Sequence, residues 1–166
     1  ASGVTAGYIQ FVVGITDWAA SDSRWSRKAR ASSGWSDEAT YPQHPAIYYD
    51  TVESLMGSRA ATQDFFRLFM IPGQSHIPQV GGGAETVDYL SYLEAWVERG
   101  EAPDVLLAQK LRRLARFAGP VTYAEYLTPD NVEFSRPVFP YPVIARYTGK
   151  GDVTDAAHWT ASAPRR

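Results

Sequence analysis

Two side chains suited to acid–base chemistry stand in glycine-bearing turns of this sequence. His76 follows the apolar run 65–71 and the dipeptide Pro72-Gly73, and an imidazole titrates near neutral pH. Asp37 ends the turn Gly34-Trp35-Ser36-Asp37, and a carboxylate can fix the tautomer of a histidine and stabilise its imidazolium form. Each residue also has an ordinary alternative: a surface histidine with no task, and an aspartate that only bonds backbone amides in its own turn.

A serine nucleophile has no recognisable motif in these residues. The nucleophile-elbow pattern G-x-S-x-G occurs nowhere, because the stretches 34–38 and 73–77 each begin it and lack the final glycine. No lysine has a serine three residues before it, so an S-x-x-K pair is also missing. Ser36 and Ser75 are the remaining candidates, although Ser75 is adjacent to His76, and neighbours rarely direct their side chains at one another. The sequence therefore offers an acid and a base without a nucleophile.

Other kinds of site find no support in the sequence. There is no cysteine, which excludes a disulfide, a thiolate nucleophile and a zinc–thiolate centre. The glycine run 81–83 has neither Walker nor dinucleotide spacing. His44, His76 and His158 form no H-x-x-x-H pair, and the acidic residues lack EF-hand spacing. We therefore expect neither a metal nor a cofactor.

Composition narrows the class of protein. The chain has 166 residues, 45% of them hydrophobic and 20% charged, which is typical of one packed domain and not of a disordered chain. The net charge of −2 leaves no basic footprint for nucleic acid, and no apolar run approaches the roughly 20 residues of a membrane helix. We expect neither nucleic acid nor membrane as a partner. No signal peptide is visible at residues 1–4, and the compartment stays open.

Three elements around the two turns follow from apolar spacing. A helix is predicted over 46–56, after Pro45 and before Gly57. The dense run 65–71 predicts a buried strand that ends at the following turn. A second helix is predicted over 84–99.

The remaining segments give less regular patterns. Residues 16–33 have no clean period and indicate a linker or irregular surface segment, and 26–33 are too polar for a central strand. For the stretch from 107 to 119, the leucine spacing favours a helix over a strand that begins near Val105. Three prolines within 137–142 exclude a central strand there.

Four stretches, in this order, resemble the C-terminal part of the tannase and feruloyl esterase family of serine hydrolases. The turn 34–37 with the following Tyr48-Tyr49 and Val52 resembles the acid-bearing turn and the helix behind it, and 65–76 resembles the strand and loop that deliver the histidine. The other two stretches are Trp96–Pro103, similar to the next helix end, and 136–152, similar to the closing segment. The resemblance runs from about Gly34 to Trp159.

The resemblance implies an α/β fold: a partial α/β-hydrolase-like sheet with flanking helices and a Pro-rich C-terminal segment. We expect residues 34–166 to form this part of the catalytic domain, with 1–33 as a divergent N-terminal segment or linker. The family implies Asp37 as the acid of a Ser-His-Asp triad and His76 as the general base. It also implies a small aromatic ester, such as a galloyl or feruloyl ester, as substrate, with no redox or nucleotide cofactor.

The sequence departs from the family at several positions. Family members typically have a cysteine directly after the histidine, disulfide-linked to one beside the serine, and here that position is Ile77. Cysteines expected in the closing segment are replaced by Phe139 and Ala161. By the resemblance, the serine elbow, the oxyanion donors and the lid are expected upstream of residue 1.

Three hypotheses of different classes follow. In the first, the chain supplies the acid and base of an ester hydrolase, and a missing segment or an N-terminal partner chain supplies the serine. In the second, a stand-alone esterase uses Ser36 or Ser75, for instance across a dimer interface; in the third, the chain is a non-catalytic remnant or interaction domain. The missing elbow favours the first over the second, while the first and third stay open. A homo-oligomer also fits, since half a sheet leaves an edge that must be covered.

Overall fold

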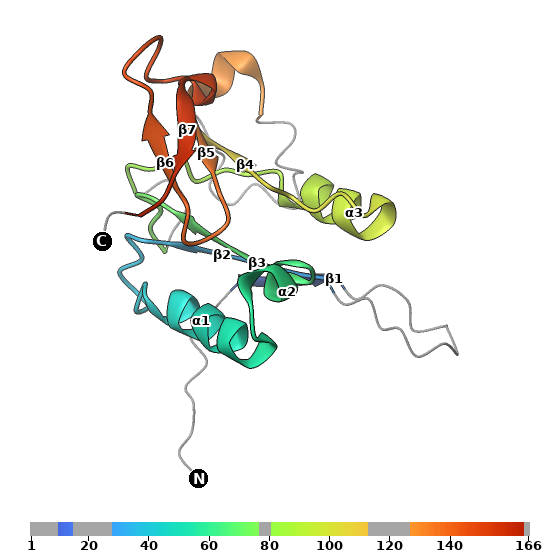
Figure 1. The fold of residues 1–166 in the computed structure, drawn as a ribbon. Helices are drawn as coiled ribbons and strands as arrows, with labels where there is room; N and C mark the ends of the chain where they lie inside the picture. The colour runs from blue at the N-terminus through green and yellow to red at the C-terminus, as the bar shows by residue number, and fades with distance from the viewer. Residues whose placement is uncertain (1–9, 15–27, 77–80, 113–126, 165–166) are drawn as a thin grey trace.

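The computed structural model of the chain describes residues 10–14, 28–76, 81–112 and 127–164 (Figure 1). These residues form a mixed α/β fold with three α-helices, two short 3-10 turns and seven β-strands. The helices are α1 (His44–Met56), α2 (Arg59–Gln63) and α3 (Tyr89–Arg99). The strands are β1 (Gln10–Gly14), β2 (Lys28–Gly34), β3 (Phe66–Ile71), β4 (Leu106–Leu111), β5 (Val132–Val138), β6 (Ile144–Tyr147) and β7 (Trp159–Ser162).

The sheet that carries the candidate site has the order β1-β2-β3. Strand β1 runs antiparallel to β2, whereas β2 and β3 are parallel. The register pairs Gly34 with Ile71, so β2 and β3 end side by side. The turn that carries Asp37 and the loop that carries His76 therefore leave the sheet at the same edge.

The prediction that residues 26–33 are too polar for a central strand is wrong for 28–33, which form β2 between β1 and β3. Side chains alternate across a strand, and in β2 the small Ala29 and Ala31 belong to the apolar side. The cationic side chains of the other face lie over aromatic rings of α3. The Lys28 Nζ is 5.4 Å from the centroid of Trp96, and the Arg30 guanidinium is 3.8 Å from that of Tyr89. Cation–π contacts allow a polar strand to occupy a buried place.

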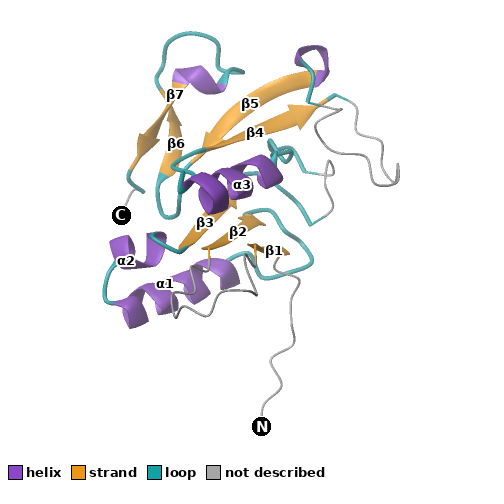
Figure 2. Ribbon diagram, turned by 90° about the vertical axis from the view of Figure 1, so that its right-hand side faces the viewer, coloured by secondary structure: helices purple, strands orange, loops and turns teal. Residues whose placement is uncertain are grey.

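Helices lie on both sides of the three-stranded sheet, as Figures 1 and 2 show: α1 and α2 on one side, α3 and the β4–β5 ribbon on the other. Each side has its own apolar core. The core toward α1 consists of Ala31, Ala46, Tyr49, Phe66, Leu68 and Met70. The core toward β4 and β5 consists of Phe69, Ile71, Ala84, Val87, Leu106, Ala108 and Val138. Both cores rest on β3, which fixes the strand before His76.

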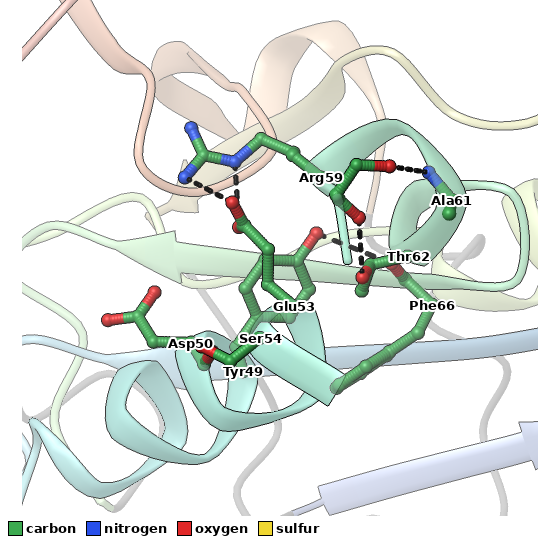
Figure 3. Close-up of polar contacts among 9 residues, drawn as sticks. Tyr49, Asp50, Glu53, Ser54, Arg59, Ala61, Thr62 and Phe66 are labelled. Carbon is green, nitrogen blue, oxygen red and sulfur yellow. Dashed lines mark hydrogen bonds and ion pairs between the residues drawn. The ribbon is translucent and has the colours of Figure 1, made fainter. Parts of the chain in front are cut away.

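The corner between α1 and α2 ties the helices to β3 (Figure 3). The Tyr49 hydroxyl donates to the backbone oxygen of Phe66 at 3.4 Å, and burial raises the pKa of this tyrosine. Arg59 and Glu53 form an ion pair at 2.9 Å, and the hydroxyl of Ser58 caps α2 by accepting from the amide of residue 61. The predicted helix over 46–56 is confirmed as α1, and the predicted strand over 65–71 is confirmed as β3.

The helix predicted from residue 107 onward is wrong where the structure describes it. Residues 106–111 form β4, which pairs antiparallel with β5, and Leu106 lies opposite Val138. The leucine spacing satisfies a helix locally, but Leu106 and Ala108, two residues apart, are both buried, as in a strand. The pairing with β5, about 30 residues away, decides the conformation. The rest of that predicted helix, 113–119, lies outside the described residues.

Helix α3 begins five residues later than the prediction over 84–99. Residues 84–87 instead run beside β4, where Thr86 and Gln109 exchange backbone hydrogen bonds of 2.9 and 2.8 Å. Asp88 then starts the helix, because its carboxylate accepts from the amide of Ser91. The Pro-rich stretch agrees with its prediction: Pro137 lies opposite Leu107 in the two-stranded β4–β5 sheet, not in a central strand.

Candidate active site

The acid turn and the histidine loop are packed backbone against backbone at the end of β2 and β3. The Trp35 amide donates to the Ile71 oxygen at 3.1 Å, and the Ser36 amide donates to the Gln74 oxygen at 3.2 Å. Gly34 lies so close to Gln74 that a Cβ atom at this glycine would collide with its backbone oxygen. These contacts bring two segments nearly 40 residues apart into one site.

Asp37 and His76 are in hydrogen-bond contact, with the Asp37 Oδ2 3.2 Å from the His76 Nδ1. The second oxygen, Oδ1, accepts from the amides of Ala39 and Thr40, both at 2.9 Å. An ionised carboxylate only accepts, so Nδ1 carries the proton and Nε2 remains for another partner. The two oxygens of Asp37 thus have separate tasks, one toward the turn and one toward the histidine.

The electrostatic surroundings keep the Asp37 carboxyl ionised. Burial opposes ionisation, but the hydrogen bonds from His76, Ala39 and Thr40 together outweigh it and hold the pKa of Asp37 below its ordinary value. The side chain of Asp37 is 11% exposed, whereas that of His76 is 38% exposed. The arrangement is a largely buried carboxylate behind a partly exposed imidazole.

Glu38 is a member of the site that the sequence analysis did not identify. Its Oε2 accepts from the backbone amide of His76 at 3.2 Å. It follows Asp37 directly, and a second carboxylate beside a candidate acid is the signal that could have drawn attention to it. Two consecutive acidic residues therefore contact the same histidine, one at its ring and one at its backbone.

The two candidate serines are placed differently. Ser75 is only 8% exposed, so its hydroxyl is not presented to a substrate. Ser36 is exposed in the acid turn, and its amide is engaged by the Gln74 oxygen. Burial therefore speaks against Ser75 as a nucleophile.

The other two histidines have different partners, and the glycine run packs on the loop that carries His76. His44 stacks edge-on against Tyr41, and the Nδ1 of His158 is 3.0 Å from the Asp152 oxygen. Among the described residues there is no group of three His, Cys, Asp or Glu side chains that could hold a metal. No helix in the described part of the chain is long and apolar enough to cross a membrane. Gly83 closes a loop, since its amide donates to the Gly73 oxygen at 3.0 Å.

The sequence of the chain is similar to those of known proteins over most of its length. A family model described as tannase and feruloyl esterase matches residues 15–162. A mono(2-hydroxyethyl) terephthalate hydrolase from Piscinibacter sakaiensis is 37% identical over 131 residues, which are 79% of this chain and 19% of that protein. A probable feruloyl esterase from Arthroderma benhamiae is 33% identical over 124 residues, 74% of this chain and 20% of that protein.

The fold is also similar to that of solved esterase structures. An esterase from Aspergillus oryzae matches with a TM-score of 0.62 at 24% identity, over 81% of this chain and 27% of that one. Feruloyl esterase B from the same species matches with a TM-score of 0.60 at 25% identity, over 81% and 26%. The chain spans about a fifth of the length of the curated relatives it matches. From the family model and these identities, the chain belongs to the tannase and feruloyl esterase family.

Proposed function

We propose that this chain supplies the acid and the base of a serine-type carboxylic ester hydrolase, with Asp37 and His76 as two members of a Ser-His-Asp triad. The observation that carries the proposal is the 3.2 Å contact between Asp37 Oδ2 and His76 Nδ1 at the ends of adjacent parallel strands. Active sites of open α/β sheets lie outside the carboxyl ends of their strands. The fold fits the C-terminal part of an α/β-hydrolase-type catalytic domain.

The proposed chemistry assigns each atom of the pair a task. The serine hydroxyl oxygen attacks the ester carbonyl carbon while His76 Nε2 takes the hydroxyl proton. His76 then donates this proton to the departing alcohol. Water attacks the acyl-enzyme in the same way, with His76 again as the base, and the acid and the free serine are released. Asp37 remains ionised throughout and stabilises the imidazolium, which agrees with its lowered pKa.

The proposed nucleophile and oxyanion donors come from a polypeptide segment other than these residues, whether in the same protein or in a partner chain. The absence of an elbow motif in this sequence and the burial of Ser75 support this division. The curated relatives are about five times longer than the stretch that this chain matches, which leaves room for such a segment.

The proposed substrate is a small ester of an aromatic acid. The relatives that match this chain include a mono(2-hydroxyethyl) terephthalate hydrolase and a probable feruloyl esterase, and both names denote esters of aromatic acids. The proposed reaction uses no metal and no redox cofactor, because the acid, the base and a serine suffice for acyl transfer.

The test combines a fluorophosphonate probe, which labels activated serines, with turnover of a p-nitrophenyl ester. We expect no labelling of the chain alone, and labelling with turnover once a segment that carries a serine elbow is supplied. His76→Ala should abolish both, whereas His158→Ala should not, because His158 lies in another part of the fold. Labelling of the chain alone that His76→Ala abolishes would instead favour a stand-alone esterase. If neither labelling nor turnover is seen with the elbow segment bound, the chain is a non-catalytic domain.

A further inference from the structure

A backbone hydrogen bond between its two ends closes the loop that carries His76. The chain leaves β3 at Pro72-Gly73, and the amide of Gly83 donates to the oxygen of Gly73 at 3.0 Å. A Cβ atom at Gly81 would collide with the Gly73 oxygen and come close to the amide of Ser75. The returning segment therefore packs on the backbone immediately before His76, and the place of the histidine depends on the place of residues 81–83.

A lysine from β4 holds this returning segment. The Nζ of Lys110 donates to the Gly81 oxygen at 2.6 Å and lies 3.1 Å from the Glu85 Oε1. The side chains of Lys110 and Glu85 are only 16% and 1% exposed. Lys110 follows Leu106 and Ala108 on the inward side of the strand, where a charged side chain is rare unless it is paired.

The segment on the other side of the ion pair is fixed to the same strand. Glu85 lies between Ala84 and Val87, which belong to the core beneath β4. Thr86 exchanges two backbone hydrogen bonds with Gln109. The ion pair therefore connects the glycine run to a paired strand and a packed core.

We propose that Lys110 and Glu85 are positioning residues for His76, an inference that rests on the catalytic role proposed for this histidine. The ion pair contacts the glycine run at the Gly81 oxygen. It acts through Gly81 and the backbone of residues 73–75, and thereby holds the imidazole at the distance at which Nδ1 meets Asp37. An apolar residue at position 110 could fill the same volume but could not bond the Gly81 oxygen, because it lacks an N–H donor.

The experiment measures the tautomer of the His76 ring by ¹⁵N NMR of the whole chain, in alkaline solution. In the wild-type chain we expect mainly the Nδ1–H form, because Asp37 accepts that proton. The double variant Lys110→Met/Glu85→Gln removes both charges without leaving a buried carboxylate alone. It should lower the ratio of Nδ1–H to Nε2–H at His76 several-fold, while Lys110→Arg should stay near the wild-type ratio.

Two further variants separate positioning from general loosening. Lys150→Met removes an exposed lysine, and Val138→Ala weakens the same core without touching the ion pair; both should keep the wild-type ratio at His76. An unchanged ratio in the folded double variant would overturn the proposal, and so would an equal fall in Val138→Ala. Should the double variant not fold, Glu85→Gln alone decides in the same way, with a smaller fall expected.

Asp37→Asn tells this inference apart from the proposed function. A wild-type ratio that does not change in Asp37→Asn would mean that the acid–base pair itself does not form in solution, and the proposed triad would fail. A ratio that falls in Asp37→Asn and stays unchanged in Lys110→Met/Glu85→Gln would leave the triad intact and refute only the positioning role.

Discussion

The acid and the base of the candidate site are held in place by different kinds of contact. Asp37 is anchored within its own turn, because its Oδ1 accepts from amides two and three residues further along the chain. The contacts of His76 and its loop cross the fold: Glu38 accepts from the His76 amide, and Lys110 donates to the Gly81 oxygen at the returning end of the loop. One residue of the pair thus has its contacts within its own turn and the other has them with distant segments, so we expect substitutions around the two residues to have different effects.

The largest expected effect comes from Asp37→Asn, which separates anchoring from chemistry. The amide oxygen of asparagine can still accept from Ala39 and Thr40, so the turn should persist. The Nδ1–H of His76 loses its ionic partner, and we expect kcat of the assembled hydrolase to fall by about 10³- to 10⁴-fold. Asp130→Asn, at an exposed aspartate, is the matched control. A loss of fold in Asp37→Asn, in place of a loss of rate, would contradict the local anchoring.

The next largest effect is on stability, through the contact between the acid turn and the histidine loop. Gly34→Ala places a Cβ against the Gln74 oxygen and should lower the free energy of unfolding by about 1–3 kcal/mol. Gly82→Ala meets nothing within 4 Å and should change it by less than about 0.5 kcal/mol. Urea unfolding followed by tryptophan fluorescence measures both. Equal effects of the two substitutions would refute the close packing of the acid turn on the histidine loop.

Glu38→Gln probes the long-range support of the base. The substitution keeps an acceptor near the His76 amide but removes the charge that strengthens this hydrogen bond. We expect kcat/KM of the assembled hydrolase to fall by about two- to fivefold, the range of one modest hydrogen bond. Glu133→Gln, at an exposed glutamate, should leave the rate unchanged. A fall as large as that of Asp37→Asn would mean that Glu38 has a direct part in the chemistry.

The smallest expected effect is a dependence of stability on pH. The pKa of Asp37 is lower in the folded chain than its ordinary value, so the stabilisation from its ionised form is fully present above that ordinary value. It is lost as the pH falls through the lowered pKa. The free energy of unfolding of the wild type should therefore decline more than that of Asp37→Asn in this acidic range. Parallel declines of the two proteins would contradict the lowered pKa.

The helix and the strand beside the site were predictable because the pattern that indicates each one lies within a single short segment. Pro45 and Gly57 bound α1, and the dense run before Pro72 marks β3, so both elements follow from nearest neighbours in the chain. Strand β2 was missed because its polar residues become compatible with a central strand only beneath aromatic rings from about 60 residues away. Strand β4 was missed because its leucines have helical spacing in the sequence. Its pairing with β5, a distant segment, cannot be seen in the local pattern.

The sequence by itself determined the family, the two turns and the residue types that could serve as acid and base. Only the tertiary structure decided that Asp37 and His76 meet, because the parallel pairing of β2 with β3 brings their turns to one edge. It also decided which residues contact the His76 loop: Glu38 at the His76 amide, and the buried Lys110–Glu85 pair at the Gly81 oxygen. The physical reason is that caps, turns and apolar spacing act over a few residues, whereas strand pairing and buried charge pairs join segments whose separation no local pattern encodes.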